Sequence, residues 1–88
     1  MKTLADVERI DHSDKITAIR LEPIMATIQA HYDRTRIDRQ SGWVSKFYRG
    51  DILVRVGFSA IRTSKEVAVD HAATWMLREI NNECSTTV

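Results

Sequence analysis

Cysteine, proline and glycine are all scarce in this chain of 88 residues. Its one cysteine, Cys84, cannot form a disulfide within the chain, which favours a reducing compartment. No apolar run approaches the roughly 18–20 residues of a membrane span, and the N-terminus lacks the apolar segment of a signal peptide. We therefore expect a cytoplasmic protein with no membrane partner.

Motifs that carry catalysis or hold cofactors are also missing. The sequence has no glycine-rich phosphate loop, and no nucleophile is paired with a base in a known pattern. His12, His31 and His71 lack metal-ligand spacing with one another or with Cys84. We expect a binding protein rather than an enzyme, with no cofactor and no metal.

The composition is that of a folded protein, with 43% hydrophobic and 28% charged residues. A chain of this length is too short for two self-sustaining cores. We therefore predict a single domain over residues 1–88, with its core in residues 14–81 and a flexible tail over residues 83–88.

Positive charge is concentrated in the middle of the chain. Residues 34–65 carry eight basic and two acidic side chains, whereas the segments on either side are net acidic. Clustered cations favour an anionic partner, although a basic strand can also be only a solvated face. The candidate site for a nucleic acid or another anionic partner consists of these cations and one aromatic residue: Arg34, Arg36, Arg39, Lys46, Tyr48, Arg49, Arg55, Arg62 and Lys65.

Helical spacing recurs in the first third of the chain. Apolar residues three apart predict a short helix over Thr3–Ile10. Ala18, Leu21, Met25, Ile28 and Tyr32 recur at steps of three and four. Because proline is favourable in the first turn of a helix, we place this second helix at residues 23–33. Residues 15–21 fit either a kinked extension of it or a strand.

The middle of the chain alternates as strands do. Residues 34–40 fit at best an exposed edge strand. Residues 43–48 and 52–58 alternate in character on either side of Arg49-Gly50-Asp51, which predicts a β-hairpin with one strongly apolar face. Trp43 and Phe47 fall on one face of it and Tyr48 on the other.

A last helix is predicted from Thr63 to about Ile80. Thr63 and Glu66 have the spacing of a capping box. Asn81-Asn82 is expected to end the helix. The apolar stripe of this helix consists of Val69, Ala72, Ala73, Met76 and Ile80.

The segment Ser64-Lys65-Glu66-Val67-Ala68-Val69-Asp70-His71-Ala72-Ala73, with Met76, Leu77 and Ile80, resembles the last helix of double-stranded RNA-binding domains. The predicted order over residues 23–80 also looks like that family's plan. The resemblance implies an α+β fold of the type α-β-β-β-α, in which a three-stranded antiparallel sheet packs against two helices. An extra helical segment would precede this core.

The resemblance also implies RNA contacts. In that family, lysines at the start of the last helix grip phosphates, and Lys65 matches one of them. Glu66 and Val69 stand where the others would be. The first helix would bring Thr27, Gln29 and His31 toward a minor groove, unless they form only a solvated polar face.

Two functions remain open. In the first, the chain is a non-catalytic module that binds a protein or a second copy of itself, as an adaptor or a small inhibitor of the kind that phages encode against host nucleases. In the second, the basic hairpin between Arg34 and Lys65 binds double-stranded RNA or another nucleic acid. The apolar stripe from Ala18 to Tyr32 exceeds what a three-stranded core needs, which favours protein binding. The candidate protein interface comprises Leu21, Met25, Ile28, Tyr32, His71 and Trp75.

Overall fold

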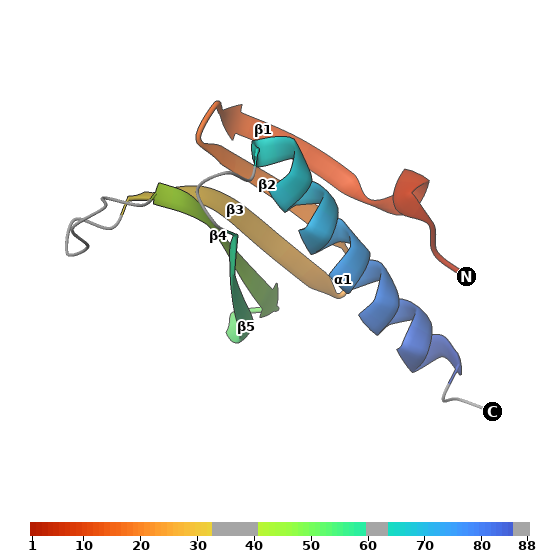
Figure 1. Ribbon diagram of the computed structural model, residues 1–88. Helices are drawn as coiled ribbons and strands as arrows, with labels where there is room; N and C mark the ends of the chain where they lie inside the picture. The colour runs from red at the N-terminus through yellow and green to blue at the C-terminus, as the bar shows by residue number, and fades with distance from the viewer. Residues whose placement is uncertain (33–40, 60–63, 86–88) are drawn as a thin grey trace.

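Five antiparallel strands and one long helix make up the fold (Figure 1). The computed structural model describes residues 1–32, 41–59 and 64–85. A short 3-10 turn, η1 (Leu4–Asp6), precedes the strands β1 (Glu8–Ser13), β2 (Ile16–Leu21), β3 (Ile24–Tyr32), β4 (Ser41–Arg49) and β5 (Ile52–Ser59). They form one sheet in the order β1-β2-β3-β4-β5, so β1 and β5 are its edges. The helix α1 (Lys65–Ser85) crosses one face of this sheet.

The predicted fold class is therefore wrong. The expected α-β-β-β-α plan had three strands and two helices, whereas the described residues form five strands, one helix and a 3-10 turn. The α+β architecture of a double-stranded RNA-binding domain is not the architecture of this chain. The hairpin and the final helix, which carried most of the resemblance, are common to many small folds.

The segment predicted as a helix over residues 23–33 is instead the central strand β3. Ile24, Ala26 and Ile28 are all buried, and the residues between them point to the other face. Alternation at every second residue fits these apolar residues as well as the helical steps of three and four do, and the β-branched isoleucines favour a strand. Pro23 lies in the turn between β2 and β3.

The helix predicted over Thr3–Ile10 is also wrong beyond its first turn. The 3-10 turn η1 ends at Asp6, whose carboxylate accepts a hydrogen bond of 2.8 Å from the Thr3 N–H. The chain then extends as β1, which pairs with β2. Residues 16–21, for which a helix and a strand both remained open, form the strand β2. Apart from the 3-10 turn, the chain before residue 33 thus forms three strands instead of the two predicted helices.

The predicted hairpin is confirmed as β4 and β5, which are joined at Gly50-Asp51. Gly50 has a φ of 60°, which a two-residue hairpin turn requires and glycine readily adopts. Tyr48 pairs with Leu53, so an uninterrupted register would bring Phe47 opposite Val54. A β-bulge intervenes, and Phe47 pairs with Arg55 instead.

The helix α1 begins at Lys65, two residues after the predicted Thr63, and it ends later than predicted. The hydroxyl of Ser64 accepts a hydrogen bond of 3.2 Å from the Val67 N–H, as an N-cap does. Thr63, the predicted cap, lies outside the described residues. The helix continues through Asn81 to Ser85, past the end predicted at Asn81-Asn82, and it includes residues 83–85 of the segment predicted as a tail. Asn81 instead exchanges two hydrogen bonds with the backbone of Lys2.

The hydrophobic core lies between α1 and strands β2, β3 and β4. The predicted stripe of the last helix is buried there, and its alanines allow the helix to approach the sheet closely. Trp43 and Trp75 pack against this core from its margin. The core residues are Ile19, Leu21, Ile24, Ala26, Ile28, Phe47, Ala68, Val69, Ala72, Ala73, Met76 and Ile80.

Candidate functional site

The two faces of the sheet differ in what covers them. The inner face packs against α1 and holds Ile24, Ala26 and Ile28 of β3. The outer face holds the alternate residues, such as Met25 and Thr27. No helix among residues 1–32, 41–59 and 64–85 covers this outer face, as Figure 1 shows. Side chains on it are therefore available to another molecule.

Apolar side chains gather on the outer face at the β5 side of the sheet. Pairing across the strands forms two rows, Met25 with Tyr48 and Leu53, and Val44 with Phe58. Between them lies Val56, opposite Lys46. Most of these apolar side chains are 41–56% exposed, whereas Val44 and Tyr48 are half-buried. We call this surface the outer apolar patch; it consists of Met25, Val44, Tyr48, Leu53, Val54, Val56 and Phe58.

The β-bulge creates this patch. In an uninterrupted hairpin, Val54 would lie opposite Phe47 and share its buried face. The shift of one residue places Arg55 there instead, so that Val56 and Phe58 face outward. A sequence pattern that puts all the apolar residues of the hairpin on one face is thus divided between two faces in the fold.

The two edges of the sheet also differ. Strand β1 carries Glu8, Arg9 and Asp11 among its six residues, and such charges discourage pairing with another strand. Strand β5 carries one charged residue, Arg55, in eight. Among the described residues, no strand pairs with its outer edge. The long apolar edge strand is therefore the part of the molecule best suited to accept another strand.

The inner side of β5 borders a shallow hollow of about 200 Å³ beside the helix. The guanidinium carbon of Arg55 lies 5.0 Å from the centre of the Trp75 ring, which is a cation–π contact. The Trp75 ring lies 4.5 Å from the ring of Phe47. His71 and Ser45 also line the hollow. Arg55 thus has a partner within the fold and points away from the outer apolar patch.

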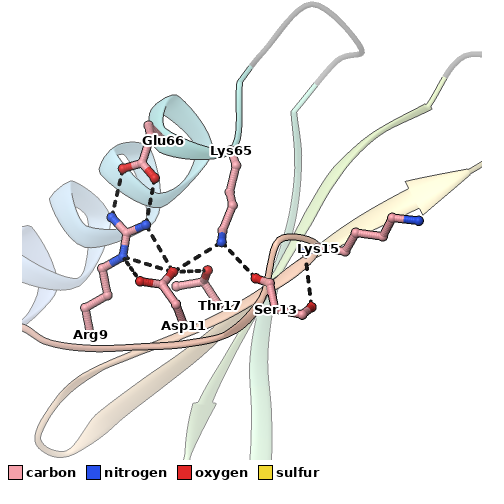
Figure 2. A network of polar contacts seen from close by, with 7 residues as sticks. All are labelled: Arg9, Asp11, Ser13, Lys15, Thr17, Lys65 and Glu66. Carbon is pink, nitrogen blue, oxygen red and sulfur yellow. Dashed lines mark hydrogen bonds and ion pairs between the residues drawn. The ribbon is translucent and has the colours of Figure 1, made fainter.

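A network of polar contacts connects β1 to the start of α1 (Figure 2). Arg9 donates two hydrogen bonds to the carboxylate of Glu66, at 2.8 and 2.7 Å, and further bonds to Asp11. The Lys65 ammonium lies 3.2 Å from Asp11 and donates to the carbonyl of Ser13 at 3.0 Å. The buried hydroxyl of Thr17 donates to Asp11 at 2.7 Å. These contacts fasten the charged edge strand to the helix.

The network also shifts the protonation of its members. Hydrogen bonds from Arg9, Thr17 and Lys65 hold the pKa of Asp11 well below its usual range. The hydrogen bonds from Arg9 also lower the pKa of Glu66, and the pKa of Arg9 is raised by Glu66 and Asp11. Each shift favours the charged form. This arrangement is that of a structural ion-pair cluster, with every charge held by another residue of the fold.

The residues predicted as a protein interface are separated in the structure. Leu21 and Ile28 are core residues, so their side chains do not reach the surface. Met25 belongs to the outer apolar patch. His71 and Trp75 line the hollow on the other side of the sheet. Tyr32 ends β3, and its side chain lies outside the described part.

The residues predicted to bind nucleic acid do not form one surface in the described part of the chain. Lys46 and Tyr48 lie on the outer face, and Arg55 lies on the inner face. Arg49 forms an ion pair with Glu83 of the helix, and Lys65 belongs to the network on Asp11. Four further cations lie outside the described residues: Arg34, Arg36, Arg39 and Arg62.

The sequence prediction missed the surface role of β5. The sequence predicts a hairpin with one apolar face that contains Val54, Val56 and Phe58, and it predicts no interface there, although the structure exposes these side chains. The available signal was the run Ile52-Leu53-Val54, in which neighbouring residues are all apolar. Successive residues of a strand point to opposite faces, so such a run makes both faces apolar. One helix covers only one of them.

Comparison of the chain with protein-family models, with curated proteins and with solved structures finds no match in any of the three. Within the described ranges, no helix is long and apolar enough to cross a membrane. Histidine, cysteine and acidic side chains do not assemble into a metal-binding group of three or more anywhere in the same ranges.

Proposed function

We propose that the chain is a non-catalytic protein-binding module that docks a protein through its outer apolar patch. The observation that carries this proposal is the exposure of an apolar row on β5, where Val56 is 55% and Phe58 is 56% exposed. In this proposal the protein acts in the cytoplasm as a small adaptor or inhibitor. Binding would remove the patch from water, which is favourable in proportion to the apolar area buried.

The composition of the patch supports this function. Aromatic residues and methionine are enriched in protein interfaces, and the patch contains Tyr48, Phe58 and Met25. The ring of Phe58 stands edge-on to that of His31, 6.0 Å away, which orders the side chain before a partner arrives. Lys46 supplies a positive charge on the same face, where it could select a partner of acidic character.

Nucleic-acid binding has less support. It requires several cations on one surface, because each neutralised phosphate adds to the affinity. Of the described candidates, Arg49 and Lys65 are engaged by acidic side chains, and Lys46 and Arg55 lie on opposite faces. The same outer face also carries several exposed apolar side chains, which gain no favourable contact from a charged phosphate backbone.

Photo-cross-linking tests the proposal. A benzophenone amino acid is placed at Phe58 in the patch and, as a matched control, at Asp70 on the exposed side of α1. We expect a discrete protein adduct from position 58 in cells, with none from position 70. The protein in the adduct, once identified and purified, should bind the wild type and fail to bind Val56→Glu. Equal adducts from both positions, or equal binding by Val56→Glu, would refute the proposal.

A further inference from the structure

The open edge of β5 has features that select its occupant. A strand edge offers unpaired N–H and C=O groups, which another strand can satisfy. The helix makes its main contacts with β2, β3 and β4, so it leaves the β5 side of the inner face open. Figure 1 shows β5 at the edge of the sheet farthest from β1. A strand added at this edge would continue the sheet on the side away from β1.

We propose that this occupant is a second copy of the chain, which pairs its own β5 antiparallel to the first and forms a continuous ten-stranded sheet. The inference rests on the proposed function, because the strand that pairs carries the exposed Val56 and Phe58 of the outer apolar patch, and it names a partner at the edge of that surface. Closed twofold assemblies are the commonest form of self-association, and they require a surface that complements itself. The sequence of β5 meets this requirement in one register.

The twofold axis restricts the register. In an antiparallel pair of identical strands with the axis perpendicular to the sheet, one residue must lie opposite its own copy. If that residue is Val56, Arg55 lies opposite Gly57, and Val54 lies opposite Phe58. If it is Arg55, two guanidinium groups oppose each other, which is unfavourable. If it is Gly57, fewer residues of the strand are paired. The register centred on Val56 is therefore preferred.

Space and chemistry both suit this register. A Cβ atom built on Gly57 meets no heavy atom within 4 Å, so there is room for the Arg55 side chain of the other copy. On the outer face, Val54, Val56 and Phe58 of the two copies would form one apolar row. The axis keeps both helices on the same side of the sheet, where each covers only its own core. Pairing would also extend the outer apolar patch to twice its length.

The proposal predicts the mass in solution and the effect of paired variants. The wild type should approach twice the 10.1 kDa of one chain as its concentration rises in sedimentation equilibrium. Gly57→Glu should strengthen the dimer, because each glutamate lies opposite an Arg55, and the matched Gly57→Lys should weaken it. Each change should alter the dissociation constant by about 2- to 30-fold in opposite directions. Shifts in the same direction would overturn the register.

Disulfide trapping tests the register directly. In a Cys84→Ser background, Val56→Cys should form an interchain disulfide, because directly opposed residues on paired strands lie close together. Val54→Cys on the same face should not, and Arg55→Cys would link only in the rejected register. A wild type that stays monomeric at all concentrations would overturn the second-copy proposal. If the benzophenone at position 58 then still cross-linked to a different protein, the proposed function would stand. If it gave no adduct, the second-copy proposal and the proposed function would both fail.

Discussion

Two phenylalanines of the same hairpin should contribute very differently to stability. Phe47 is 2% exposed and lies in the core between the sheet and α1, whereas Phe58 is 56% exposed on the outer face. Phe47→Ala removes a buried ring and leaves a cavity, which should cost about 3–5 kcal/mol in the free energy of unfolding. Phe58→Ala loses mainly the edge-on contact with His31, worth about 0.5–1.5 kcal/mol.

The assay is urea unfolding followed by tryptophan fluorescence. Both substitutions are made in a Val56→Glu background, in which the glutamates of two copies would oppose each other and self-association does not contribute. Within one chain the exposed glutamate lies opposite Lys46, so it should change the free energy of unfolding by about 0.5 kcal/mol or less. The slope of the transition should be similar in all variants, and the midpoint should fall much further for Phe47→Ala. If Phe58→Ala destabilised the protein as much as Phe47→Ala, the outer face would be core, and the proposed binding surface would be wrong.

Three further predictions concern the rest of the fold and the rejected function. Because the folded-state pKa values of Asp11 and Glu66 lie below their usual range, these groups stabilise the fold above about pH 5, and this contribution is lost as the pH falls toward about 2. The destabilisation caused by Arg9→Ala, measured by urea unfolding, should therefore be larger at neutral pH than in acid; an equal loss at both would contradict the network's role. Gly42→Ala should destabilise by about 1–3 kcal/mol, because its Cβ would lie 2.2 Å from the carbonyl oxygen of Ser59. Gly57→Ala should be neutral or stabilising, and thermal melts of the two variants measure the difference. If Gly57→Ala were less stable than Gly42→Ala, β4 and β5 would not be paired as described. Finally, duplex RNA and duplex DNA should show no binding that weakens steeply with salt, and a steep salt dependence that Lys46→Glu abolishes would favour the nucleic-acid alternative.

The hairpin and the last helix could be predicted from the sequence because their signals are local. A two-residue turn with glycine between alternating segments identifies β4 and β5, and the stripe that includes Val69 and Met76 identifies α1. The first three strands could not be identified in the same way. Ala18, Leu21, Met25 and Ile28 fit a helical stripe by their spacing, although they lie on two adjacent strands on either side of the turn at Pro23.

The candidate site depended on a feature that the sequence does not display. The bulge opposite Tyr48 decides whether Val54, Val56 and Phe58 face the core or the solvent. The bulge places Arg55, instead of Val54, opposite the buried Phe47 and against Trp75. Sequence periodicity alone cannot locate such a shift, so the apolar face of the hairpin was predicted and its direction was not.

Hydrogen exchange at the two edges of the sheet is the most direct test of the claim that β5 is the binding edge. Exchange is measured for amides of β5 and β1 across a dilution series of the wild type and of Gly57→Lys. We expect that β5 amides become protected as the concentration of the wild type rises, that β1 amides do not, and that Gly57→Lys reduces the protection. If β5 amides exchanged at the same rate at every concentration, the claim that a second copy binds at this edge would be contradicted.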